Sequence, residues 1–133
     1  MAGKITVSTI NDSSGVLATQ NGMTGIAKAW VNFVGAATPT INGSFNVSSI
    51  TYNIGGDYTI NFTTALPNAN YATLGATSAF PSTYAGYTCV NRNGSTGAFV
   101  TPTTTSCRIN TLAQNLTSCQ DSGYQTYVAV LGA

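Results

Sequence analysis

The feature that most constrains the fold is a two-residue alternation of side chains on either side of a double glycine. Tyr58, Ile60 and Phe62 lie on one face of an extended segment, and most of the opposite positions are Asn, Thr or Ser. The double glycine lies in "NIGGD", and glycine readily takes the positive backbone angles that tight hairpin turns require. Residues 44–64 are therefore predicted to form a β-hairpin with one core face and one solvated face.

The rest of the chain has the same character. Thr, Val, Ile, Tyr and Phe are plentiful and are interrupted by Gly and Asn, a pattern typical of short strands and turns. The strands are predicted at 4–10, 25–33, 44–52, 57–64, 71–79, 86–90, 97–101, 106–112 and 124–131. In the third of these, Phe45 and Val47 would share a face. The expected fold is a single all-β domain over 1–133, an antiparallel β-sandwich or jelly-roll-like head.

Charged residues make up only 5% of the chain, far below the roughly 25% of ordinary soluble proteins. In their place stand 22 threonines, 13 asparagines and 12 serines, and the net charge is +1. Such a surface gives little repulsion between copies, which favours an oligomer. The four cations are scattered, so no basic patch for nucleic acid is expected. No apolar run has the length of a signal peptide or membrane span, so we expect synthesis in a cytoplasm and no membrane partner.

Two segments are apolar on both faces. In 25–33, Trp30 lies opposite an apolar face of Ala27, Ala29, Val31 and Phe33. In 124–131, Val128 and Val130 lie opposite Tyr127. Strands of this kind are usually buried on both faces, inside the domain or against another chain. We therefore predict an oligomer interface that includes Trp30, Val128 and Val130.

The chain offers little for catalysis. It has no histidine and no glutamate, and Asp12, Asp57 and Asp121 each stand in a turn-like context. General acid and base chemistry needs titratable groups in pairs, and a glycosidase pair would have to form from these aspartates or across a subunit seam. The lysines Lys4 and Lys28 lie in predicted strands and are expected to be solvated. We predict no catalytic residues and no enzymatic activity.

Three cysteines, Cys89, Cys107 and Cys119, lie in the last third of the chain. Without histidine and without short Cys-x-x-Cys spacing they make a poor metal site, so no metal and no cofactor is expected. Two interpretations remain open: a structural disulfide between two of them, or buried free thiols.

One segment has the composition of a recognition loop. Residues 82–97, "STYAGYTCVNRNGSTG", combine tyrosines, an arginine and asparagines with small flexible residues. The alternative is that its tyrosines pack at a sheet edge. The candidate ligand-binding residues in and beside it are Phe80, Tyr84, Tyr87, Arg92 and Asn93.

Four stretches together resemble a known module: "AKAWVNF", "SFNVSSIT", "GDYTINFTTALPNANYA" and the terminal "YVAVLG". Their order and spacing are similar to those of bacteriophage virion proteins, especially distal parts of tail fibres and related appendages of marine and cyanobacterial phages. The resemblance covers about half the chain. It implies a β-rich head that assembles as a homotrimer and has no catalytic residues.

The resemblance leaves two functions open. The first is a surface-exposed tail-fibre or knob head in the virion, which contacts other virion proteins and a host surface glycan or protein. The second is a capsid decoration protein that binds no receptor. The first is favoured by the usual place of the resembled family on fibres. The second is favoured by the methionine that stands shortly before the first predicted strand, with no fibre shaft between them.

Overall fold

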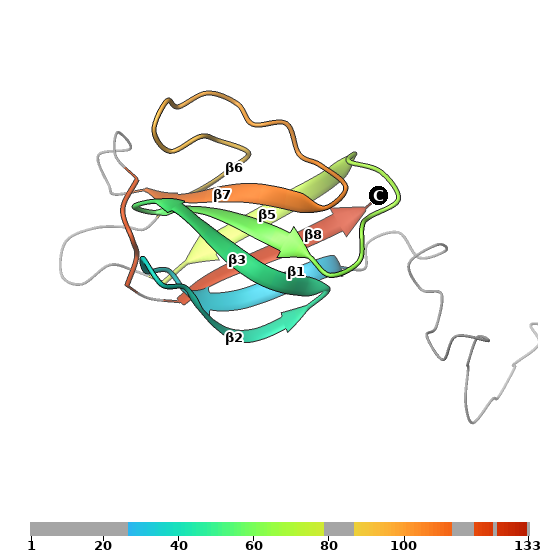
Figure 1. Ribbon diagram of the computed structural model, residues 1–133, viewed down its shortest axis with the longest axis horizontal. Coiled ribbons are helices and arrows are strands. Elements are labelled where there is room, and N and C mark those ends of the chain that lie inside the picture. The colour runs from blue at the N-terminus through green and yellow to red at the C-terminus, as the bar shows by residue number, and fades with distance from the viewer. Residues whose placement is uncertain (1–26, 79–86, 113–118, 124, 133) are drawn as a thin grey trace, which may run out of the picture.

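The computed structural model describes residues 27–78, 87–112, 119–123 and 125–132, and within them it contains eight strands and no helix. The strands form two antiparallel four-stranded sheets that pack face to face (Figure 1). The predicted all-β sandwich is confirmed. The strands are β1 (Ala27–Val34), β2 (Thr40–Phe45), β3 (Val47–Ile54), β4 (Asp57–Phe62), β5 (Tyr71–Thr77), β6 (Tyr87–Val90), β7 (Ser106–Leu112) and β8 (Gln125–Gly132).

Each sheet combines strands from distant parts of the chain. The first sheet has the order β2-β1-β8-β5, and the second has the order β3-β4-β7-β6. Strand β8 pairs with β1 on one side and β5 on the other, so the last described strand lies inside the first sheet (Figure 1). The outer surface of that sheet is therefore built from four segments that are far apart in sequence.

The core lies between the two sheets. Alternate residues of β4 point inward, and Tyr58, Ile60 and Phe62 are buried as predicted. The ring of Phe33 packs edge-on against that of Tyr58, with centroids 5.2 Å apart and an interplanar angle of 74°. Such edge-to-face contacts are a preferred arrangement of buried aromatic rings. The other core side chains are Ala29, Val31, Val47, Leu66, Cys107, Ile109, Val128 and Val130.

The prediction of one strand over 44–52 was wrong, because the chain changes sheets at Asn46. This residue has a positive φ of 54°, which asparagine tolerates better than most side chains. Its Nδ2 donates to the carbonyl of Lys28 at 3.1 Å, and its Oδ1 accepts from the amide of Thr64 at 2.8 Å. Phe45 consequently points outward from the first sheet, whereas Val47 lies in the core.

The other strands follow the predictions with small differences. The segment 106–112 matches β7, and the hairpin turn at Gly55–Gly56 joins β3 to β4. Five further strands, predicted at 25–33, 57–64, 71–79, 86–90 and 124–131, shift by one or two residues at their ends. The segment 97–101 is not a strand and forms only an isolated bridge between Phe99 and Arg92. The segment 4–10 lies outside the described residues.

Candidate functional site

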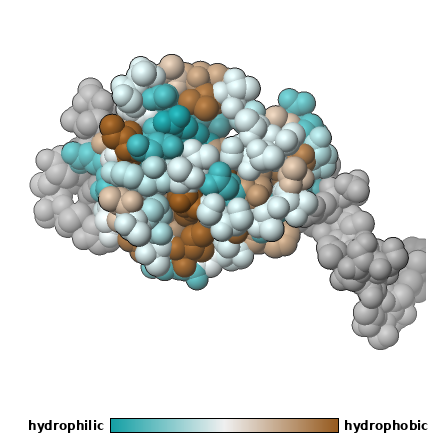
Figure 2. Space-filling view, viewed as in Figure 1, coloured by the Kyte–Doolittle hydropathy of each residue, from teal (hydrophilic) through white to brown (hydrophobic). Residues whose placement is uncertain are grey.

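The outer surface of the first sheet carries a group of large exposed hydrophobic side chains. Trp30 is 43% exposed, Phe45 45%, Leu74 54% and Tyr127 44%. We call the surface formed by these four residues the aromatic face. Figure 2 shows, from the same side as Figure 1, a surface on which hydrophilic and intermediate residues predominate and hydrophobic residues form only small patches. Contiguous exposed apolar surface on a soluble protein often marks a contact site.

Cross-strand pairing arranges the aromatic face in rows. Paired residues on one face of a sheet stand side by side. One row runs across the sheet as Phe45, Trp30, Ala129 and Leu74, and the next runs as Gly43, Asn32, Tyr127 and Ala76. Each row places small residues next to large ones, and neither row contains Asp, Glu, Lys or Arg.

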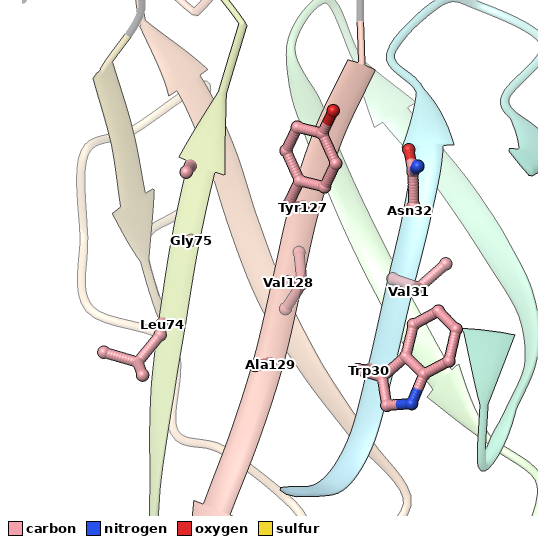
Figure 3. Close-up of a pocket in the computed structure, with 9 residues that line it drawn as sticks. Trp30, Val31, Asn32, Leu74, Gly75, Tyr127, Val128 and Ala129 are labelled. Carbon is pink, nitrogen blue, oxygen red and sulfur yellow. The ribbon is translucent and has the colours of Figure 1, made fainter. Parts of the chain in front are cut away.

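The small residues create a hollow in the aromatic face. Its volume is about 470 Å³, and Ala129 forms its floor between Trp30 and Leu74. Figure 3 shows Trp30, Tyr127 and Leu74 projecting from three neighbouring strands around this space. The Trp30 ring extends over Gly43 of β2, where an added Cβ would lie 3.6 Å from a ring carbon. Trp30 and Phe45 therefore form a ridge beside the hollow.

Amide groups border one end of the hollow. The Tyr127 hydroxyl donates to Oε1 of Gln125 at 2.5 Å, and Nδ2 of Asn32 donates to the same oxygen at 3.5 Å. Nδ2 of Asn42 donates to Oδ1 of Asn32 at 3.4 Å. This end is polar but uncharged, so the surface suits a neutral partner.

The second concentration of polar groups surrounds Asp57, which is fully buried. Its carboxylate accepts from Nε and Nη2 of Arg108 at 2.7 and 2.6 Å, from the amide of Gly94 at 2.6 Å and from Nδ2 of Asn53 at 3.1 Å. The hydrogen bond to Asp57 raises the pKa of Arg108, so the guanidinium stays protonated. The turn-like interpretation of Asp57 was incomplete: this carboxylate anchors the loop after β6 to the second sheet.

Asp121 has a similar structural role. Its Oδ1 accepts from the Tyr58 hydroxyl and from the Gly56 amide, both at 2.7 Å, and its Oδ2 accepts from the Tyr52 hydroxyl at 3.4 Å. Burial, followed by the hydrogen bond to Asp121, raises the pKa of Tyr58. These contacts fasten residues 119–123 to the β3–β4 hairpin. Asp12 lies outside the described residues.

The predicted ligand residues are not all described. Phe80 and Tyr84 lie outside the described residues, and Tyr87 begins β6, where it pairs with Leu112. Nη1 of Arg92 donates to Sγ of Cys119 at 3.3 Å. Oδ1 of Asn93 accepts from the amides of Ser95 and Thr96 at 2.9 and 3.1 Å, which closes a turn. Arg92 thus links its loop to Cys119, and Asn93 stabilises a turn within the loop. Ligand binding by these five residues stays a prediction.

The predicted interface residues separate into two groups. Trp30 points outward on the aromatic face, but Val128 and Val130 are 4% and 1% exposed, in the core of the single chain. Both valines are therefore removed from the candidate interface, because the alternation of β8 places them between the sheets. Lys28 also differs from expectation, since it is 3% exposed, at an irregularity in the pairing of β1 with β8.

The three cysteines are free thiols. Burial raises the pKa of Cys107 to about 12, and burial is also the main cause of the raised pKa of Cys119. Across the described ranges, no three His, Cys, Asp or Glu side chains gather where they could hold a metal ion. The same ranges contain no helix long and apolar enough to cross a membrane.

Comparison of the chain with protein-family models, with curated proteins and with solved structures finds no match. The candidate site therefore rests on the geometry of this molecule. Sequence reasoning identified Trp30 but missed Phe45, Leu74 and Tyr127 as its companions. Their outward positions depend on the sheet change at Asn46 and on the pairing of β5 with β8, which no local pattern reveals.

Proposed function

We propose that this protein is a non-enzymatic structural protein of a bacteriophage virion, a homotrimeric head domain of a tail fibre or knob. The observation that carries the proposal is the aromatic face, a group of four large exposed hydrophobic side chains whose rows contain no charged residue. Exposed surface of this kind is costly in water and is retained where another macromolecule covers it. The resemblance of the strand sequences to phage appendage modules supplies the biological setting.

The described ionic groups support an architectural role. The carboxylate of Asp57 is used in a buried ion pair, and that of Asp121 accepts hydrogen bonds from the protein itself. The hollow is lined by apolar residues, Asn32 and Tyr127, a set that does not provide an acid and a base poised near neutral pH. Binding and assembly are the functions that such groups can perform.

Antibody labelling of intact virions, viewed by electron microscopy, tests the proposed location. We expect label at the distal ends of fibres or knobs. Label distributed over the capsid shell would instead favour a decoration protein without receptor binding. Absence of the protein from purified virions would contradict the proposal.

A host-binding assay tests the receptor component. Purified protein should bind host cells, and digestion of host surface glycans or of surface proteins would separate the two receptor classes. The same sample should not cleave host polysaccharide. Cleavage that is lost in Asp121→Asn while the fold is retained would show that the protein is an enzyme.

A further inference from the structure

We infer that the aromatic face is the surface through which copies of this chain contact one another, with the ridge of one copy seated in the hollow of the next. The inference rests on the proposed homotrimer and specifies its contacts. The ridge is Trp30 and Phe45 on β1 and β2, and the hollow lies over Ala129 between Trp30, Leu74 and Tyr127.

Shape is the first argument. The ridge and the hollow lie side by side because Phe45 and Trp30 are paired on β2 and β1, whereas the next position of that row, on β8, is the small residue Ala129. Leu74 of β5 follows on the far side of Ala129. A space of about 470 Å³ falls in the range of sites that enclose small ligands, so it admits an aromatic side chain. Well-packed interfaces place aromatic anchors in such hollows.

Charge is the second argument. Neither row of the aromatic face carries a charged residue, so a partner with many ions would leave some of them desolvated and unpaired. The chain itself is 5% charged, and its own aromatic face is a neutral apolar surface. A second copy therefore meets the requirement in charge.

Symmetry is the third argument. When the ridge of each copy sits in the hollow of the next copy, the contact is heterologous, and it forms a ring if the rotation between copies closes. Reciprocal contact between two copies would instead be isologous and form a dimer. Phe45 pairs with Trp30 from the β2 side, whereas the hollow lies on the β8 side of Trp30, so each copy presents its ridge and its hollow at the same time. A ring of three satisfies every ridge and every hollow.

Two complementary variants of the full chain test this geometry by size-exclusion chromatography with light scattering. A ridge variant, Phe45→Ser, leaves the residues that line the hollow unchanged, and a hollow variant, Ala129→Phe, leaves the ridge unchanged. Each variant alone should lose the trimer. An equal mixture should form a one-to-one complex, because it restores one intact ridge-to-hollow contact. Circular dichroism checks that each variant is folded. If one of the two variants does not fold, Leu74→Ser is used in its place. Phe99→Ser is the control, since Phe99 is 72% exposed but lies outside the aromatic face.

The outcomes separate the inference from the proposed function. If the wild-type chain is a trimer and the folded ridge and hollow variants remain trimers, the inference is wrong and the trimer stands on other contacts. If the wild-type chain is a monomer, both fail. Trp30 is the only tryptophan, so its fluorescence reports this surface alone. Its emission maximum should shift to longer wavelength when the trimer dissociates on dilution. If the emission does not change on dilution but changes when maltoheptaose is added, the aromatic face is a carbohydrate site and the inference is wrong.

Discussion

Replacing Asp57 by alanine should destabilise the protein more than most single substitutions. The carboxylate is fully buried and accepts four hydrogen bonds, two of them from Arg108. Removing one member of a buried ion pair costs about 3–5 kcal/mol, because the other charge stays behind without its partner. Total stabilities are about 5–15 kcal/mol, so the variant should be close to the limit of folding.

Thermal unfolding at fixed protein concentration measures this loss. A domain of this size loses about 3 °C of Tm per kcal/mol, so Asp57→Ala should lower Tm by about 10–15 °C. The amide of Gly94 should also exchange with solvent faster, because its acceptor at 2.6 Å is removed. Fixed concentration is needed because assembly contributes to the apparent stability.

A double-mutant cycle identifies the cause. Arg108→Met with Asp57→Ala should cost clearly less than the sum of the two single changes, because the double variant leaves no unpaired buried charge. Arg108 retains 20% side-chain exposure, so its loss alone should cost less than that of Asp57. Additive effects, or a Tm change of only a few degrees in Asp57→Ala, would refute the view that this ion pair anchors the loop.

Three further predictions concern the backbone and the pH dependence. Gly56→Ala should prevent stable folding, because the new Cβ would lie 2.4 Å from the backbone of Gln120. Gly123 also has a positive φ, but no atom lies within 4 Å of the position of its added Cβ. Gly123→Ala should therefore lower the unfolding free energy, measured by urea titration, by only about 1–2 kcal/mol. Asn46→Ala should cost about 1–3 kcal/mol in the same titration, since it loses the hydrogen bonds that hold the sheet change, and an unchanged midpoint would contradict that role. The pKa of Cys107 rises from 9.0 to about 12 on folding, so the folded state holds this proton more tightly than the unfolded state. The contribution of Cys107 to the unfolding free energy should therefore be complete below about pH 9 and fall toward pH 12, by at most about 1.4 kcal/mol per pH unit. Cys107→Ala should remove this part of the pH dependence.

Local patterns predicted most of the fold. The alternation of Tyr58, Ile60 and Phe62 and the double glycine after Ile54 define the β3–β4 hairpin, because side-chain period and turn chemistry act within a few residues. The sheet change at Asn46 was not predictable in this way. Its positive φ is stabilised by Lys28 and Thr64, each 18 residues away.

The candidate site was predictable only in part. Trp30 was identified because it stands opposite an apolar face within its own strand. Leu74 and Tyr127 become its neighbours through the strand order β1-β8-β5, which joins the two ends of the domain in one sheet. The burial of Asp57 likewise depends on Arg108, 51 residues away. Sequence patterns fix which face a residue occupies, whereas the strand order decides what lies beside it.

The central claim is that this chain works by assembling with copies of itself through an exposed apolar face. Sedimentation equilibrium of the purified full chain at micromolar concentration tests it most directly. The account predicts a single species with three times the 13.6 kDa mass of one chain. A stable monomer at these concentrations would contradict it.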